Sequence, residues 1–379
     1  MSWPITDEQR MIQLMVREFT RKEIEPVAAD NDREGRFPVG IIEKMAELGL
    51  MGMMVPAQYG GAEVGAVSYS LALQEIAHAC ASTAVIMSVT NLSCEPLLLF
   101  GSEEQKEQWL PPLASGEGLG AFALTEPEAG SDPGGLRTQA VKGSDGYTIN
   151  GSKVFITNGA HAITFVLVAR TSQESGKKAL SAFLIPRGTP GLDVGPEEEK
   201  MGLHASSTVP LTLEDCSVPL EHRLGQEGDG FRIAMAALDG GRIGIASQAT
   251  GIGQACLDES VRYSKERKQF NRFLSSFQAI SWMIADMATE VEAARLLTLQ
   301  AASQKDLRQS FTREASVAKL YASEMANRAA YSALQIHGGY GYTRHYKVER
   351  LYRDARVTTL YEGTSEVQRI VISREELRG

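Results

Sequence analysis

The period of the hydrophobic pattern changes twice along this 379-residue chain, and the change limits the possible folds more than any other feature. Apolar residues recur at helical spacing from about residue 5 to 115, where Met11, Met15 and Phe19 share one face. Between about 118 and 225 the pattern shortens to β-branched and aromatic runs bounded by turn residues. After about 226 the helical period returns. This order predicts an α+β protein.

Three domains follow from these two changes: an N-terminal helical domain, a middle β-domain and a C-terminal helical bundle domain, at residues 1–117, 118–225 and 226–379. In the first domain, Thr6 and Gln9 have capping-box spacing, and Ser102 is placed to cap a further helix. In the second, three runs predict strands: Gly146–Gly151, Ile163–Val168 and Leu180–Ile185.

Acidic residues outnumber basic ones, 47 against 38, which gives a formal net charge of −9. Such a field repels polyanions, so we expect no nucleic-acid partner, and an anionic ligand must meet local positive groups. No window approaches the roughly 20 apolar residues that span a bilayer, so we expect no membrane partner. The start of the chain has no signal-peptide pattern. We expect a cytoplasmic protein in a bacterium, or a mitochondrial matrix protein in a eukaryote.

Several motif matches have no clear chemical meaning. The four cysteines lie in apolar surroundings without CxxC spacing, which favours buried free thiols, and we expect no metal site. Gly251-Ile252-Gly253 has Cys256 where a dinucleotide-binding loop needs its third glycine, so helix packing is its expected role. Ser316-Val317-Ala318-Lys319 matches the SxxK pattern of serine acyl-enzymes, but its companion motifs are missing from the sequence. We attribute that match to chance.

Two loop segments of the middle domain are suited to a ligand. The run from Phe122 to Asp132 combines acids, hydroxyls, a proline and a glycine, a composition that exposes backbone N–H groups. Phe155-Ile156-Thr157-Asn158-Gly159 offers an aromatic face, a hydroxyl and a turn. Taken alone, each segment is equally consistent with an ordinary turn.

Two segments of the third domain are ambiguous in the same way. The basic run Lys265–Arg272 can receive a pyrophosphate through its arginines, or it can be a solvated helix end whose cations complement the helix dipole. The run Gln335–Tyr342 breaks a helix with three glycines, which either end the helix or let a ligand approach its backbone. His337 within it is expected to be structural.

Glu362 lies between Tyr361 and Gly363, beside the hydroxyls of Thr364 and Ser365. A carboxyl against apolar surface has a raised pKa and accepts a proton from carbon more effectively than a solvated one. Ser365 and Glu366 are equally able to cap and begin a last helix. The residues alone therefore predict an enzyme-like chain without specifying its reaction.

Six separated motifs, in this order, resemble the acyl-CoA dehydrogenase family across nearly the whole chain. They are LTEPEAGSD at 124–132, FITNG at 155–159, LDGGRIGIA at 238–246, ERKQF at 266–270, IHGGYGY at 336–342 and YRDARVTTLYEGTSEVQR at 352–369. The resemblance implies a helical N-terminal domain, a middle β-domain and a C-terminal four-helix domain, with FAD held between the last two.

The resemblance also implies which residues contact FAD. The expected contacts within one chain are Phe122, Leu124, Thr125, Ser131, Phe155, Ile156, Thr157, Thr364 and Glu366. The expected contacts to the FAD of a neighbouring subunit are Arg267, Phe270, Gln278, Gln335, Gly338 and Gly339. The implied assembly is a homotetramer built as a dimer of dimers.

Glu362 matches the family's catalytic base, which removes the α-proton of an acyl-CoA while a hydride leaves the β-carbon for FAD. Some relatives place the base immediately before the arginine of the GGR motif, and that position is Gly241 here. The residues that match acyl-CoA contacts are Ser131, Phe231, Asp239, Arg242 and Gly363. The implied product is trans-2-enoyl-CoA, and electron-transferring flavoprotein is the implied electron acceptor.

The motifs are most similar to those of short-chain, butyryl-CoA members. A glutaryl-CoA member would carry an arginine near Ala84, where this chain is uncharged. Two departures from the family pattern are Phe155, where many relatives have tryptophan, and Asn271-Arg272-Phe273, where relatives have a QFGxP loop. The alternatives are a dehydrogenase of a branched or cyclic acyl-CoA, an acyl-CoA oxidase and a non-catalytic CoA-binding protein.

Overall fold

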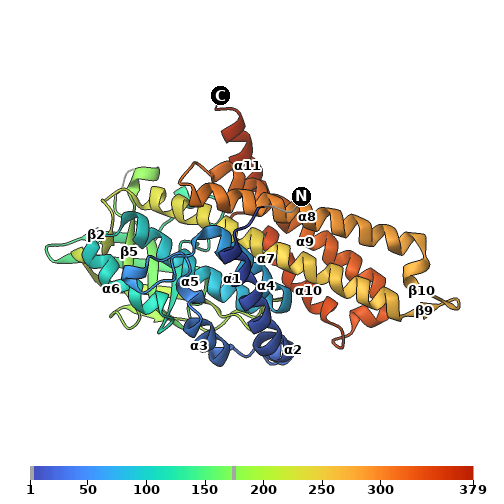
Figure 1. Ribbon diagram of the computed structural model, residues 1–379. Helices are drawn as coiled ribbons and strands as arrows, with labels where there is room; N and C mark the ends of the chain where they lie inside the picture. Colours follow the sequence, from blue (N-terminus) through green and yellow to red (C-terminus); the bar gives the residue numbers. More distant parts are fainter. Residues whose placement is uncertain (1–3, 173–175, 379) are drawn as a thin grey trace.

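The computed structural model describes residues 4–172 and 176–378, and its first part is helical (Figure 1). Its helices are α1 (Asp7–Phe19), the π-helical segment η1 (Thr20–Ile24), α2 (Glu25–Glu34), α3 (Val39–Glu47), α4 (Gly65–Ala79), α5 (Ala81–Phe100) and α6 (Glu103–Ala114), with 3₁₀ turns η2 (Leu50–Gly52) and η3 (Ala57–Tyr59). The capping box expected at Thr6 and the cap expected at Ser102 are both present, and Ser102 forms a full capping box with Gln105. Backbone N–H groups at the start of α1 and of α6 thereby donate to side-chain oxygens.

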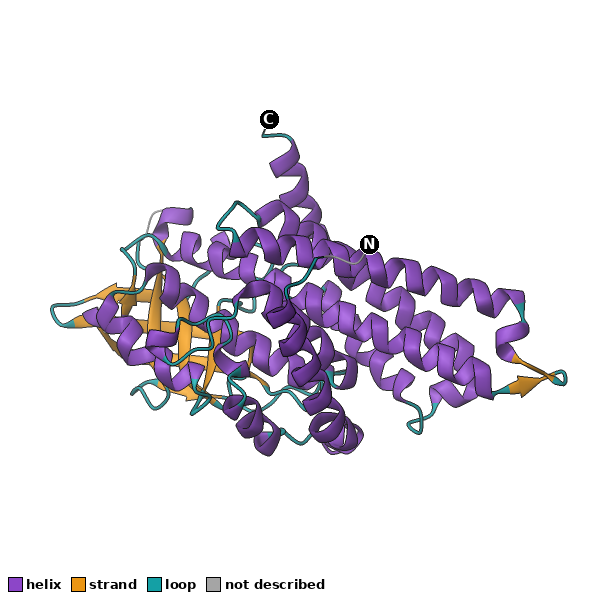
Figure 2. Ribbon diagram, viewed as in Figure 1, coloured by secondary structure: helices purple, strands orange, loops and turns teal. Residues whose placement is uncertain are grey.

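An eight-stranded sheet follows, in the order β6-β7-β3-β2-β4-β5-β8, with β1 added in parallel to β4 (Figure 2). The strands are β1 (Leu119–Ala123), β2 (Gln139–Lys142), β3 (Gly146–Thr157), β4 (Ala162–Arg170), β5 (Leu180–Pro186), β6 (Leu192–Val194), β7 (Thr208–Pro219) and β8 (Arg223–Leu224). The short turns η4 (Pro133–Gly135), η5 (Lys177–Ala179) and η6 (Leu220–His222) connect them. All three runs predicted as strands lie in β3, β4 and β5.

The last part is again helical and is built on α7 (Gly230–Glu266). At 37 residues, α7 is about 55 Å long, and it runs from the sheet through the whole bundle (Figure 1). The remaining elements are β9 (Lys268–Gln269), β10 (Arg272–Phe273), η7 (Leu274–Ser276), α8 (Gln278–Asp306), α9 (Thr312–His337), η8 (Gly338–Tyr342), α10 (Lys347–Arg356), η9 (Val357–Thr359) and α11 (Ser365–Glu376). The predicted order of helical, β and helical parts is therefore confirmed.

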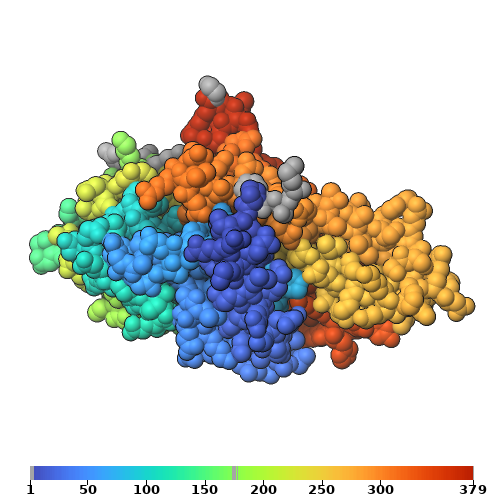
Figure 3. Space-filling view, viewed as in Figure 1, coloured from blue at the N-terminus to red at the C-terminus, as the bar shows by residue number. Residues whose placement is uncertain are grey.

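α5 is the central helix of the N-terminal part, and it corrects one expectation. By length and composition α5 could cross a membrane, so the statement that no window approaches such a length was wrong. However, 83% of its most apolar window is buried inside the protein, where α5 packs against α4, α7 and β1. A buried core helix passes the same composition test. In Figure 3 the N-terminal helices cover the junction between the sheet and the bundle.

Close helix packing explains the glycines of α7. A Cβ atom on Gly251 would lie 2.4 Å from the carbonyl oxygen of Gln74 in α4, and one on Gly253 would lie 2.6 Å from Sδ of Met325 in α9. These glycines therefore let α4 and α9 approach α7, as the sequence predicted. The four cysteines are free and buried, which also confirms the prediction.

We predict that Gly251→Ala lowers the free energy of unfolding by about 1–3 kcal/mol, because the added methyl overlaps the backbone of α4. Gly40→Ala is the matched control, since a Cβ on Gly40 in α3 meets nothing within 4 Å. That change should leave stability unchanged or raise it by up to about 1 kcal/mol. Thermal unfolding of both variants checks the prediction, and equal midpoints would contradict the packing argument.

Candidate active site

Glu362 lies in a left-handed turn between η9 and α11, with φ of 53° at Glu362 and 85° at Gly363. A non-glycine residue in this region is strained by roughly 1–2 kcal/mol, so the surroundings must hold it. Gln368 Nε2 donates to the carbonyl oxygens of Glu362 and Gly363 at 3.0 and 2.8 Å. Lys319 Nζ donates to the Gly363 carbonyl at 2.7 Å, and Thr364 caps α11. The turn is therefore fixed from α9 and α11 together.

The carboxyl of Glu362 is shielded although the residue as a whole is partly exposed. Its Oε2 is buried and has no hydrogen-bond partner among the described residues. Burial raises the pKa of Glu362 to about 7, while the charges of Arg242 and Lys319 act in the opposite direction. A carboxylate oxygen with a free lone pair and a pKa near neutrality is suited to remove a proton from carbon.

The opposite wall of the site is a glycine face of α7. A Cβ on Gly241 would lie 2.7 Å from Glu362 Oε2 and 3.1 Å from Leu92 Cδ1. Any larger residue at Gly241 would therefore displace the carboxyl of Glu362. This overlap explains physically why there is room for an acidic side chain at position 241 or at position 362, but not at both.

Below this wall, Arg242 forms a buried polar network. Its Nη1 donates to Asp239 Oδ1 at 2.5 Å and to Ser316 Oγ at 3.3 Å, and Thr312 donates to Asp239 Oδ2 at 2.6 Å. Burial lowers the pKa of Arg242 and raises the pKa of Asp239. The Nε of Arg242 is buried without a partner among the described residues.

The SxxK residues have a structural role here. Among the described residues Ser316 donates to the backbone of Thr312 and accepts from Arg242, which agrees with the prediction that the match to the serine acyl-enzyme motif is due to chance. Yet one helical turn brings both residues to the site, Ser316 onto Arg242 and Lys319 onto the turn of Glu362. Sequence reasoning missed this role because it tested the pair only against one enzyme motif.

The two ligand-suited loops of the sheet domain lie side by side. Val154 N donates to the Thr125 carbonyl at 2.9 Å. Lys153, which is fully buried, donates to the Leu124 and Val168 carbonyls at 3.0 and 2.6 Å and to Glu126 at 2.7 Å. Sequence analysis did not single out Lys153. A lysine inside a strand, 27 residues after a loop acid, was the available signal.

A β-bulge presents Phe155 at the end of β3. The pairing of β3 with β7 shifts register between Lys153 and Ile156, and Phe155 has φ of 59° and is 65% exposed. A bulge re-aims a side chain in this way. Ile156 is buried, whereas Thr125 and Thr157 are partly exposed and their hydroxyls donate to no described residue. An exposed aromatic ring beside free hydroxyls fits a planar, polar-edged cofactor.

Of the remaining FAD and acyl-CoA candidates, two pack against the core and two are exposed. Phe122 and Phe231 both pack against the core cluster beneath β4 and β5, and Ser131 is exposed. Glu366 is exposed in the first turn of α11, where its backbone N–H lowers the pKa of its carboxyl. Within the described part of the chain, no hydrogen bond links Ser131 to the turn of Glu362.

The candidates expected to serve a neighbouring subunit gather at the far tip of the bundle. The guanidinium of Arg267 lies 5.3 Å from the ring centre of Tyr340, which joins the basic run to the glycine-rich η8. Phe270 is 87% exposed, and Gly338 and Gly339 have nothing within 4 Å of an added Cβ. Gln278 and Gln335 are also exposed. Figure 1 places β9 and β10 at the opposite end of the molecule from β2 and β5.

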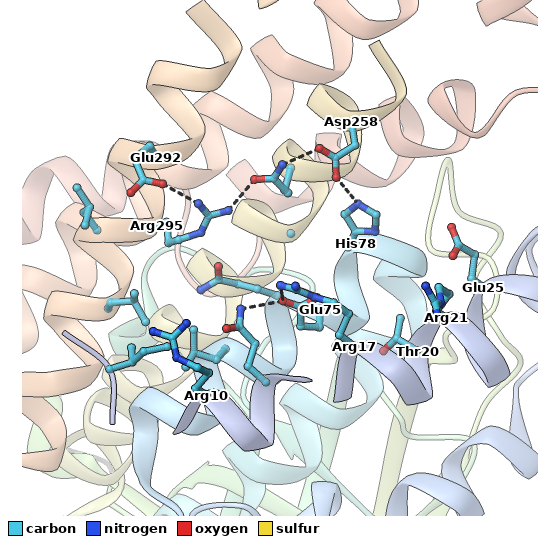
Figure 4. Close-up of a pocket in the computed structure, with 18 residues that line it drawn as sticks. Arg10, Arg17, Thr20, Arg21, Glu25, Glu75, His78, Asp258, Glu292 and Arg295 are labelled. Carbon is cyan, nitrogen blue, oxygen red and sulfur yellow. Dashed lines mark hydrogen bonds and ion pairs between the residues drawn. The ribbon is translucent and has the colours of Figure 1, made fainter. Parts of the chain in front are cut away.

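A cavity of about 750 Å³ lies elsewhere, between α1, α4, α7 and α8 (Figure 4). Its charged walls largely neutralise one another through the ion pairs Arg17–Glu75 and Arg295–Glu292, and His78 forms a hydrogen bond with Asp258 (Figure 4). None of the candidate residues lines it. The chemistry around Glu362, rather than cavity size, therefore identifies the candidate site.

Three domain models of one family match the chain. They are "Acyl-CoA dehydrogenase, N-terminal domain" at residues 6–117, "Acyl-CoA dehydrogenase, middle domain" at 121–216 and "Acyl-CoA dehydrogenase, C-terminal domain" at 228–377. The short-chain specific acyl-CoA dehydrogenase of Clostridium acetobutylicum is 48% identical to this chain, over 100% of both.

Two solved structures are similar over their full length. The butyryl-CoA dehydrogenase of Megasphaera elsdenii has a TM-score of 0.97 and 44% identity, with 100% of both chains covered. A chain from the work described as "Electron transferring flavoprotein of Acidaminococcus fermentans: Towards a mechanism of flavin-based electron bifurcation" has a TM-score of 0.98 and 46% identity, again with 100% coverage of both.

The raised pKa of Glu362 predicts a pH-dependent effect of Glu362→Gln on stability. The unfolded carboxyl ionises from about pH 4.5, whereas the folded one stays protonated up to about pH 7, so the folded state loses stability as pH rises between these values. The neutral amide avoids that loss. Relative to the parent, Glu362→Gln should gain up to roughly 3 kcal/mol of stability between pH 4.5 and 7, at about 1.4 kcal/mol per pKa unit.

The measurement is the unfolding midpoint of both proteins from pH 4.5 to 8. Glu366→Gln is the control, because the pKa of Glu366 is lowered and the sign of its effect is reversed. A gain for Glu362→Gln that is the same at pH 4.5 and pH 8 would show that Glu362 titrates normally.

Proposed function

The chain belongs to the acyl-CoA dehydrogenase family of oxidoreductases acting on CH–CH donors, and we propose that it converts a short-chain acyl-CoA to trans-2-enoyl-CoA. The observation that carries this proposal is the shielded, unpartnered Oε2 of Glu362, set in a turn that α9 and α11 hold. The names of the Clostridium and Megasphaera relatives support a short acyl chain. The uncharged, buried Ala84 gives no group for a second carboxylate.

Glu362 acts as the base in this proposal. Its Oε2 accepts the α-proton, while its backbone N–H, which donates to no described residue, is available for the thioester oxygen as negative charge develops there. The nearby positive charge of Arg242 favours the ionised carboxyl before the proton arrives. Shielding from water keeps that carboxylate basic.

We assign FAD as the cofactor, which when bound accepts the hydride that leaves the β-carbon. The exposed Phe155 ring and the free hydroxyls of Thr125 and Thr157 fit the flavin, and the exposed Gly338 and Gly339 fit a close approach of the dinucleotide. The proposed FAD contacts in the same chain are Phe122, Leu124, Thr125, Ser131, Phe155, Ile156, Thr157, Thr364 and Glu366. Those to FAD of a second subunit are Arg267, Phe270, Gln278, Gln335, Gly338 and Gly339.

The acyl-CoA is assigned to Ser131, Phe231, Asp239, Arg242 and Gly363. Electron-transferring flavoprotein is the proposed acceptor, which the similarity to the Acidaminococcus chain supports. We propose a homotetramer, because β9 and β10, which flank Phe270, lie at the opposite end of the molecule from β2 and β5 of the sheet and so are placed to serve a second subunit (Figure 1). Domain bounds at 1–117, 118–225 and 226–379, and a cytoplasmic or matrix location, are part of the same proposal.

We predict that Glu362→Gln abolishes oxidation of butyryl-CoA while the protein still binds FAD and acyl-CoA, because an amide cannot accept the α-proton. The rate should fall by at least about 10²–10⁴. The measurement is anaerobic single-turnover bleaching of the oxidised flavin, together with equilibrium binding of a non-reactive acyl-CoA analogue.

Glu366→Gln is the internal control, since its assigned role is FAD contact, and it should loosen FAD while retaining turnover. Bleaching of the Glu362→Gln flavin within a few-fold of the parent rate would show that the base lies elsewhere. Bleaching of the parent only with branched or cyclic acyl-CoA would revise the substrate, and fast reoxidation by oxygen would indicate an oxidase.

Arg267→Ala should weaken FAD retention and assembly together, because one guanidinium supports both the cofactor and the interface. The parent should hold about one FAD per chain, and loss of a charge-assisted phosphate contact should cost roughly 1.5–3 kcal/mol of FAD binding. Arg262→Ala is the matched control, since Arg262 lies five residues earlier in the last part of α7 and, among the described residues, forms its ion pairs with Glu259 and Glu266 of the same helix. FAD titration and sedimentation measure both properties, and an Arg267→Ala variant with unchanged FAD affinity would refute the role.

A further inference from the structure

Lys319 is a buried cation beside the proposed base, and the reaction described above gives it no task. It lies in the middle of α9, is 0% exposed, and directs Nζ to the Gly363 carbonyl at 2.7 Å. Burying a charged ammonium group costs free energy unless opposite charges and hydrogen bonds compensate for the lost water. Burial indeed lowers the pKa of Lys319 to about 8, and the negative charge of Glu362 is the largest influence in the opposite direction.

A hydrogen bond alone does not account for Lys319. The Gly363 carbonyl already accepts from Gln368 Nε2 at 2.8 Å, so a neutral donor holds the same atom. Lys319 also forms no ion pair with a carboxylate among the described residues, and so it leaves Glu362 Oε2 open. Its distinguishing property at this position is therefore its charge.

We propose that Lys319 is a positioning residue for the base: it locks the Glu362–Gly363 turn through the Gly363 carbonyl and supplies the positive charge that keeps the Glu362 carboxyl ionised. This role rests on the proposed function of Glu362. Lys319 keeps its own proton throughout, because the α-proton goes to Glu362 and no proton passes between the two side chains. Ser316, one turn earlier on α9, holds Arg242, so α9 places both cations that act on the base.

The other charged and titratable groups near the turn come from every helix packed around it. They are Tyr69 on α4, Glu95 on α5, Asp239 and Arg242 on α7, Lys305 on α8, Glu324 on α9, and Glu366 and Arg374 on α11. Glu95 is paired with Lys305 and Asp239 with Arg242, so these charges largely cancel. The charge of Lys319 is not cancelled by such a pair.

The test compares Lys319→Met with Gln368→Met. Both remove a donor to the same turn, and only the first removes a charge. The rate of flavin bleaching by butyryl-CoA is measured from pH 5.5 to 9.5 for the parent and both variants. Lys319→Met should move the midpoint of the pH profile upward by about 1 pH unit or more, which lowers the rate at pH 7 by about fivefold or more, because about half of Glu362 is ionised at that pH in the parent. Gln368→Met should lower the plateau and leave the midpoint in place.

A second readout needs neither substrate nor FAD. In the Lys319→Met background, the stability gain of Glu362→Gln should still begin near pH 4.5, but the pH at which it stops increasing should move upward by the same amount. If Lys319→Met does not fold, Lys319→Gln, which keeps a neutral donor, takes its place, and Lys319→Arg should restore the parent midpoint. A midpoint unchanged in both readouts would overturn the proposal for Lys319. Failure of the parent to bleach with butyryl-CoA would instead refute the proposed substrate.

Discussion

The left-handed turn at Glu362 and Gly363 is the constraint on which the rest of the site depends. It aims a carboxyl at the glycine face of α7, and it exists only because α9 and α11 donate three hydrogen bonds to two consecutive carbonyls. The close approach at Gly241 leaves no room for a larger side chain at that position. These hydrogen bonds hold the strained turn in a position where burial shields the carboxyl oxygen and raises the pKa of Glu362 to about 7.

The three parts of the fold together position the surroundings of this turn. α7 carries its wall, and the same helix reaches the sheet at one end and the bundle tip at the other (Figure 1). In the sheet, the buried pair of Lys153 and Glu126 ties the loop at Leu124 to the bulge at Phe155. The bundle tip at β9 and β10 lies at the opposite end of the molecule from β2 and β5 (Figure 1), and the cofactor site proposed above therefore takes residues from two subunits.

The sequence predicted the order of the domains, the capping box at Thr6, the cap at Ser102 and the main strands, because these follow from local periodicity and side-chain caps. It also singled out Glu362, through its neighbours Tyr361 and Gly363 and through the family resemblance of the segment at 352–369. It did not reveal Lys153 or the task of Lys319, because a buried lysine is explained only by partners that tertiary packing brings from other elements. Likewise, α5 is identified as a buried core helix, and not as a membrane span, only when the elements that bury it are known.

Removal of an α-proton by Glu362 can be measured apart from oxidation. A 3-thia acyl-CoA has acidic α-protons but no β-hydride to lose, so in D₂O its exchange with solvent, followed by NMR, reports the base alone. The account predicts that the holoenzyme catalyses this exchange and that Glu362→Gln slows it by at least about a hundredfold. Exchange at the parent rate in Glu362→Gln would contradict the assignment of the base.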